Sequence, residues 1–177
     1  MRDTKEKLSL LSIGLHGLVA SIVIGLIVIE MDYPIIHKSL GLLLIIPVIM
    51  RIIWRIKNGW PIPLNSQINI ETILAKASHW ILITGSFLLP MTGIIMSIYG
   101  GYGVDVFGLT LLPENYDASN KDLIIPIDPF ISTIANKLHE IVANIMMGVI
   151  FLHIMGALKH HFIYKDHTLY RMFRIKK

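Results

Sequence analysis

Four long apolar stretches constrain the fold of this chain more than any other feature. They cover roughly residues 9–29, 36–56, 78–99 and 134–158. A helix needs about 20 residues to cross a hydrocarbon core of ~30 Å, and within lipid the backbone polar groups must be satisfied by the protein itself. We therefore predict an all-α fold, a membrane-embedded antiparallel four-helix bundle that forms one domain over residues 1–177.

The composition supports an integral membrane protein. Hydrophobic residues make up 54% of the chain and charged residues only 16%, which is less charged than an ordinary soluble domain. The first stretch follows MRDTKEK without an A-x-A-like cleavage site, so it is interpreted as a span rather than a signal peptide. The chain has no cysteine, which excludes disulfides, cysteine-ligated iron–sulfur clusters and covalent haem attachment through C-x-x-C-H.

The charges are divided unequally between the two sides of the predicted bundle. Thirteen of the sixteen Lys and Arg residues, but only four of the twelve acids, lie in the N-terminus, the 51–77 segment and the C-terminal tail. The positive-inside rule then predicts that both termini of this multi-pass protein lie in the cytoplasm. The net charge of +4 is thus a sign of topology and of lipid-headgroup contact, not of nucleic-acid binding.

Two further features bear on the packing of the spans. The 100–133 connection is the one long loop on the outer side, and we expect it to cap the outer helix ends. Seven small residues inside the spans allow helices, or a flat cofactor, to approach closely, and close helix packing is the simpler interpretation of each. These residues are Gly14, Gly17, Gly25, Gly85, Gly93, Gly148 and Gly156.

Four histidines inside the spans point to a function. His139 and His153 are fourteen residues apart in LHEIVANIMMGVIFLH, so their side chains leave one helix face about 21 Å apart along the axis. His37 opens the second span at the outer side, as His139 opens the fourth, and His16 matches His153 in depth near the inner side. Ionisable side chains within a bilayer are costly and usually functional. We expect His37 to face His139 and His16 to face His153.

Each predicted pair offers two imidazoles on facing helices, which is how helical bundles build cofactor sites. Zinc and copper fit poorly, because the two layers are about 20 Å apart and zinc takes four ligands. An iron porphyrin takes two axial imidazoles, so the pattern favours two non-covalent b-type haems with His16, His37, His139 and His153 as ligands. A structural or ion-handling membrane protein without haem remains an alternative.

The remaining histidines have simpler explanations. His79 lies at the inner end of the third span beside Trp80 and is interpreted as interfacial, and His160 and His161 follow the fourth span at the level of the lipid headgroups. His167 lies in the tail and is expected to be solvated. Polar groups at this inner side are also candidates for a quinone pocket. The tentative contacts of that pocket are His160, Lys159 and His79.

Three segments of the chain resemble the bacterial cytochrome b561 family. They are IIHKSLGLLLIIPVIMRIIWRIKNGWPIP around the second span, HWILITGSFLLPMTGIIM in the third, and LHEIVANIMMGVIFLHIMGALKHHFIYKDHTLYRMF at the end. The resemblance covers nearly the whole chain and implies a four-helix dihaem cytochrome whose ligands match the four histidines of the two layers. The chain departs from the family at Gly17 and Leu138, where the family often has tryptophan.

Two axial histidines leave the iron no open coordination site, so the expected activity is outer-sphere electron transfer. The resemblance implies transfer from periplasmic superoxide to ubiquinone. The outer side is acidic overall, which repels an anion, yet Lys38 adjoins His37 and Lys137 lies close to His139 in sequence. These two lysines are the candidates for attracting superoxide. The alternative is a haem-bearing relay subunit that takes electrons from a periplasmic dehydrogenase or hydrogenase partner.

Overall fold

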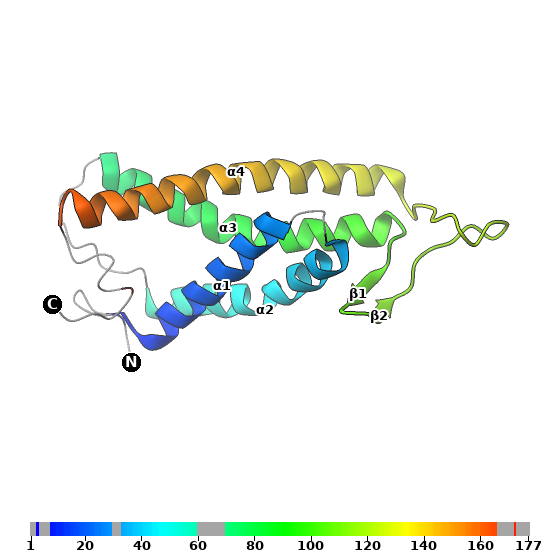
Figure 1. The fold of residues 1–177 in the computed structure, drawn as a ribbon, viewed down its shortest axis with the longest axis horizontal. Helices are drawn as coiled ribbons and strands as arrows, with labels where there is room; N and C mark the ends of the chain where they lie inside the picture. Colours follow the sequence, from blue (N-terminus) through cyan, green and yellow to red (C-terminus); the bar gives the residue numbers. More distant parts are fainter. Residues whose placement is uncertain (1–2, 4–7, 30–32, 60–69, 166–171, 173–177) are drawn as a thin grey trace.

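Four long helices and one short β-hairpin make up the fold. The structure is a computed structural model that describes residues 3, 8–29, 33–59, 70–165 and 172. In chain order the elements are α1 (Leu10–Ile29), α2 (Pro34–Asn58), α3 (Ile70–Tyr99), β1 (Val104–Val106), β2 (Leu109–Leu112) and α4 (Pro129–Phe162). All four helices are long and apolar enough to cross a membrane. The chain is therefore a mostly helical, multi-pass membrane protein, as predicted (Figure 1).

Three of the helices, α2, α3 and α4, extend past the predicted spans because the helical backbone continues beyond the apolar stretch, whereas α1 matches its span to within one residue. The largest difference is in α3, which begins at Ile70 and not near residue 78. Local sequence explains several ends. Asp128 caps α4 by accepting from the backbone N–H groups of Phe130 and Ile131. Gly59 ends α2 with φ at 75°, a left-handed conformation that glycine adopts without strain.

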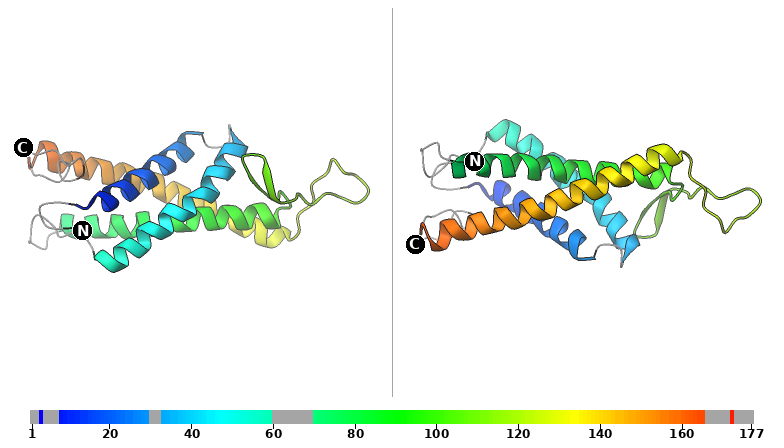
Figure 2. Two further views of the ribbon diagram at one scale, coloured as in Figure 1. Left: turned by 90° about the horizontal axis from the view of Figure 1, so that it is seen from below. Right: turned by 90° about the horizontal axis from the view of Figure 1, so that it is seen from above.

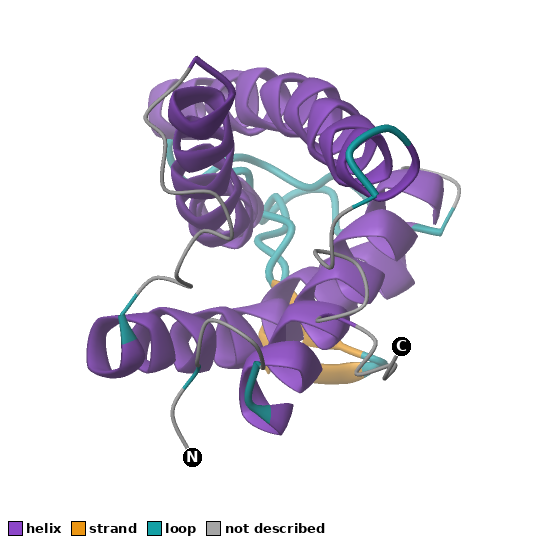
Figure 3. Cartoon of the chain, turned by 90° about the vertical axis from the view of Figure 1, so that its left-hand side faces the viewer, coloured by secondary structure: helices purple, strands orange, loops and turns teal. Residues whose placement is uncertain are grey.

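The helices form two antiparallel pairs. α3 and α4 lie side by side along most of their length, and α1 packs against α2, which in turn contacts α3. The α1–α2 pair is inclined to the α3–α4 pair (Figure 2). Figure 3 shows the helices from the end that carries the start of α1 and the end of α4, with the two strands behind them. We call this end the terminal end, and the opposite one the hairpin end.

The distribution of buried and exposed residues suits a lipid surround. A small apolar cluster fills the centre of the bundle, formed by Val19, Val23, Leu44, Val48 and Met146. Large apolar side chains on the outside of the bundle are exposed, such as those of Val28, Phe151 and Leu152 at 75%, 63% and 63%. Small hydroxyl residues are buried instead, among them Ser39, Ser86 and Thr92. Small residues between helices and apolar residues toward lipid are typical of membrane bundles.

Close helix packing, expected at seven glycines, occurs at few of them. At Gly85 an added Cβ would collide with Met146, and at Gly93 it would touch the ring of His139. At the other five an added Cβ meets nothing within 4 Å, namely Gly14, Gly17, Gly25, Gly148 and Gly156. The close-packing interpretation is therefore wrong at these five positions.

A β-hairpin at the hairpin end was not predicted. β1 and β2 pair antiparallel around a two-residue turn in which Phe107 and Gly108 have φ of 49° and 88°, and positive φ at both central residues is typical of type I′ hairpins. The Phe107 N–H donates to the Ser39 hydroxyl of α2 at 2.8 Å. The hairpin thus packs against α2, whereas the 113–127 segment projects beyond the helix ends and does not cover them (Figure 1).

Candidate functional site

The structure brings together one histidine pair near the terminal end. His16 of α1 and His153 of α4 have ring centres 6.4 Å apart, with ring planes inclined by 61°. His16 lies in the second turn of α1 and His153 about ten residues before the end of α4, so antiparallel packing places them at one depth. Both side chains are half-buried and point between the helices.

A second pair lies toward the hairpin end. His37 of α2 and His139 of α4 have ring centres 6.3 Å apart and ring planes inclined by 65°. The two histidines of α4 are separated by fourteen residues, or about 21 Å at helical rise. The structure thus contains two similar histidine pairs, one near each end of the bundle.

The spacing within each pair fits two ligands on opposite sides of one metal ion. A metal–imidazole bond is about 2 Å long and a ring nitrogen lies about 1.2 Å from its ring centre, so two such imidazoles have centres about 6.4 Å apart. Among the described residues no group of three or more His, Cys, Asp or Glu side chains could hold a metal ion by itself. The donor set therefore suits an iron porphyrin, which needs only two axial nitrogens from the protein.

His139 is held in a conformation that leaves one ring nitrogen available. Its Nδ1 lies 3.1 Å from the carbonyl oxygen of Leu89 and 3.0 Å from the hydroxyl of Thr92. A carbonyl only accepts, so Nδ1 carries the proton and Nε2 keeps its lone pair. A histidine ligand whose other nitrogen donates to a backbone carbonyl is the usual second shell of a metal site.

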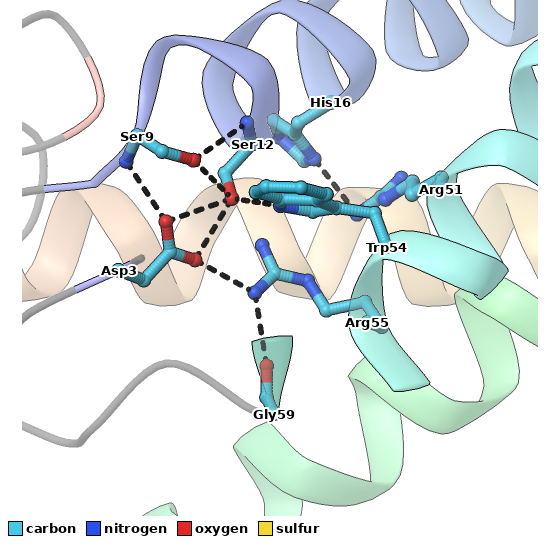
Figure 4. Close-up of polar contacts among 8 residues, drawn as sticks. All are labelled: Asp3, Ser9, Ser12, His16, Arg51, Trp54, Arg55 and Gly59. Atoms are coloured by element: carbon cyan, nitrogen blue, oxygen red, sulfur yellow. Dashed lines mark hydrogen bonds and ion pairs between the residues drawn. The ribbon is translucent and has the colours of Figure 1, made fainter. Parts of the chain in front are cut away.

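His16 has a different neighbour. The Nη2 atom of Arg51, on α2, lies 2.9 Å from Nδ1 of His16 (Figure 4). A guanidinium only donates, so this ring nitrogen accepts. The sequence analysis did not select Arg51. Its position in an apolar span, in the half nearer the terminal end and one turn before Arg55, was the feature that could have identified it.

A polar cluster ties the start of α1 to the end of α2 next to this histidine pair. The Asp3 carboxylate accepts from the Ser9 N–H, the Ser12 hydroxyl and the guanidinium of Arg55, and the Trp54 indole N–H donates to Ser12 at 2.7 Å (Figure 4). Burial raises the pKa of Asp3, but these hydrogen bonds outweigh it and hold the pKa below its usual value. We call these five residues the Asp3 cluster. It fixes the helix ends that position His16.

His79 lies closer to the terminal-end pair than expected for an interfacial residue. Its ring centre is 5.1 Å from that of His153, which is shorter than the ~6.4 Å that two ligands of one metal require. Its Nδ1 lies 2.6 Å from the Ala75 carbonyl oxygen. His79 is therefore a neighbour of His153 and not its opposite ligand.

The other tentative quinone contacts lie at the helix ends. Lys159 forms an ion pair with Glu71 at 2.7 Å, Tyr164 donates to the same carboxylate, and the His160 ring centre is 5.3 Å from that of Tyr164. Glu71 precedes His79 by eight residues on α3, about 12 Å at helical rise. The structure thus places Lys159 about two turns from His79. His167 lies outside the described residues.

The two lysines expected to attract superoxide are both exposed at the hairpin end. The Nζ atom of Lys38 lies 5.3 Å from the centre of the Tyr102 ring. Successive helical residues are rotated by about 100°, so Lys137 and His139 project about 160° apart around α4. Lys137 consequently faces away from the histidine pair. The side chain of Lys38, one residue from His37, leaves its helix at a smaller angle to the pair, about 100°.

Comparison with known proteins agrees with this geometry. A family model described as prokaryotic cytochrome b561 matches residues 7–174. Cytochrome b561 homolog 2 of Escherichia coli K12 is 32% identical over 96% of this chain and 93% of its own length. The probable superoxide oxidase CybB of Yersinia pestis is 30% identical over 97% of this chain and 98% of its own length. The chain belongs to the prokaryotic cytochrome b561 family, whose members are membrane electron carriers with b-type haem.

Proposed function

We propose that the chain holds two b-type haems, one between His16 and His153 and one between His37 and His139, and carries electrons across the inner membrane. The observation that supports this most is the pair of ring-centre distances, 6.4 Å and 6.3 Å. Bound haem supplies a one-electron iron couple at each site. The four imidazoles of His16, His153, His37 and His139 would hold the two irons, two to each, which would disfavour oxygen chemistry at the iron and favour electron transfer.

The proposed donor is superoxide, on the side that the hairpin end faces, and the proposed acceptor is ubiquinone at the terminal end. Two superoxide ions each lose one electron and leave as dioxygen, while one quinone takes up the two electrons and two protons. The name of the Yersinia relative supports the donor. The polar residues around His79 and at the ends of α3 and α4 support a quinone site on the other side. The basic terminal segments support cytoplasmic termini.

The first experiment is haem quantitation and a reduced-minus-oxidised spectrum of the purified protein, followed by rapid mixing with superoxide and then with a ubiquinone analogue. We expect two low-spin b haems per chain, reduction by superoxide within the mixing experiment, and reoxidation by quinone. Two haems that ignore superoxide would contradict the proposed donor and favour the relay-subunit alternative. A colourless preparation from haem-sufficient cells would contradict haem binding itself.

The role of the lysines has its own test. Because Lys38 adjoins His37 and Lys137 faces away from His139, replacing Lys38 with Gln should slow superoxide consumption several-fold and weaken its salt dependence. Lys137→Gln should have a smaller effect. Lys121→Gln in the projecting loop serves as a matched control that removes the same charge. Equal rates in all three variants would refute electrostatic attraction by Lys38.

A further inference from the structure

Arg51 is a cation inside the helix bundle, and among the described residues no carboxylate forms an ion pair with it. Within the part of the chain that the structure describes, the ion pairs join Arg55 to Asp3 and Lys159 to Glu71, and no carboxylate lies within ion-pair distance of Arg51. Arg51 and Arg55 are one turn apart on α2. Arg55 is therefore neutralised by a protein carboxylate, whereas Arg51 donates to the uncharged ring of His16.

The contact between Arg51 and His16 is incompatible with metal binding by His16. A neutral imidazole has one nitrogen that donates and one that accepts, so it has a single lone pair to offer. Arg51 uses that lone pair in this structure, and a metal ion needs the same one. This holds for either ring nitrogen. Once His16 becomes an iron ligand, its remaining ring nitrogen carries a proton, and Arg51 must find another acceptor.

The haem itself brings the acceptors that Arg51 would lack. A guanidinium has five N–H donors and no acceptor, and it matches a carboxylate with two parallel hydrogen bonds. A half-buried guanidinium left without an acceptor is costly. Haem b carries two propionate carboxylates on one edge, and Arg51 is already in hydrogen-bond contact with the ring expected to bind its iron.

We propose that Arg51 leaves His16 when haem binds and pairs with a propionate of the haem held by His16 and His153. This inference rests on the proposed haem site at the terminal end. The pairing orients that haem with its carboxylate edge toward α2 and keeps a positive charge beside it. A nearby positive charge stabilises the reduced iron, so Arg51 raises the reduction potential of this haem and favours electron arrival on the terminal side.

In the part of the chain that the structure describes, no such arginine lies at the hairpin-end site. The two described arginines, Arg51 and Arg55, are in the second half of α2, and the nearer one is fourteen residues from His37, about 21 Å at helical rise. There the Nδ1 atom of His139 already lies 3.1 Å from the Leu89 carbonyl oxygen. The effect of Arg51 should therefore be confined to one of the two haems.

The test compares Arg51→Gln with Lys57→Gln, which removes the same charge from an exposed position six residues further along α2, in the purified haem-loaded protein. Redox titration should show that Arg51→Gln makes one haem at least tenfold harder to reduce, a potential lower by about 59 mV for one electron. The other haem should be unchanged, and Lys57→Gln should shift neither potential by as much. Infrared redox difference spectra with propionate-labelled haem should show shifted carboxylate bands only in the Arg51 variant.

Arg51→Lys keeps the positive charge but loses the planar guanidinium with its two parallel N–H donors. This variant can be measured if Arg51→Gln fails to accumulate. It should retain most of the potential while the labelled carboxylate bands still shift. If the wild-type protein binds two haems, and their potentials and carboxylate bands are the same in every Arg51 variant, this inference is wrong and the proposed function stands. Wild-type protein without haem would instead refute the proposed function.

Discussion

The four paired histidines are the residues on which the proposed function depends. Because His37 and His139 belong to one pair and His16 and His153 to the other, replacing one histidine with alanine should remove one haem and leave the second. The haem content measured by pyridine haemochrome analysis should fall from two haems to about one per chain in each of the four variants. His161→Ala, outside both pairs, should keep two. Loss of both haems in every single variant would contradict two independent sites.

Asp3 is a second residue with a testable role, because its carboxylate joins α1 to α2. Its side chain is only 4% exposed and is paired with Arg55. A pKa lowered in the folded protein stabilises the fold above the unfolded value of about 3.9, and this contribution is lost as the pH falls through the folded pKa. Asp3→Asn should cost about 1–3 kcal/mol at neutral pH.

The check is thermal unfolding in detergent, followed by helix circular dichroism between pH 3 and pH 7. Wild type should lose stability as the pH falls below about 4, and the difference between wild type and Asp3→Asn should shrink over the same range. A difference that stays constant with pH would show that the Asp3 carboxylate is not ionised in the fold. Asp122→Asn, in the projecting loop, removes an exposed carboxylate and serves as the control.

Among the elements, the hairpin is joined to α2 by a hydrogen bond to a buried hydroxyl. Ser39 is fully buried; it donates to the Ile35 carbonyl and accepts from the N–H of Phe107, whose φ is positive. Without this bond the turn loses a hydrogen bond to α2, although β1 still packs against the helix. Ser39→Ala should cost about 1 kcal/mol in this contact, so amide exchange at residues 104–112 should rise about fivefold.

Hydrogen exchange followed by mass spectrometry measures that change. Ser119→Ala is the matched control, because the hydrogen bonds of Ser119 go to Asp117, within the projecting loop. That variant should leave exchange in the hairpin unaltered. Unchanged exchange in Ser39→Ala would mean that strand pairing alone, and not the helix, fixes the hairpin.

For the whole molecule, the prediction concerns orientation in the membrane. The absence of cysteine allows single cysteines to be labelled without background. Lys57→Cys at the terminal end and Ser119→Cys in the projecting loop are both at exposed positions. By the positive-inside rule, an impermeant maleimide added to spheroplasts should label Ser119→Cys nearly completely and Lys57→Cys only after lysis. The reverse pattern would invert the orientation and move the proposed superoxide side to the cytoplasm.

The helices and the histidine pairs were largely predictable from the sequence, for a physical reason. A bilayer requires about 20 apolar helical residues for each span, and this requirement reveals the helices without any tertiary information. Depth along a span follows from residue number at 1.5 Å per residue, so His16 could be matched with His153 and His37 with His139. That these pairs bind haem stays a prediction. The hairpin was missed because its short strands follow no long apolar pattern.

The amino-acid sequence was sufficient to identify a membrane protein with four long helices, the histidines that share a depth, and the family of the chain. The surroundings of each histidine, in contrast, depend on how the helices pack. Helical periodicity gives the direction in which a side chain leaves its own helix, but not which helix it meets, because the tilt and rotation of neighbours are set by packing along their whole length. For that reason Arg51 beside His16, His79 beside His153, and the open space at five glycines emerge only from the folded bundle.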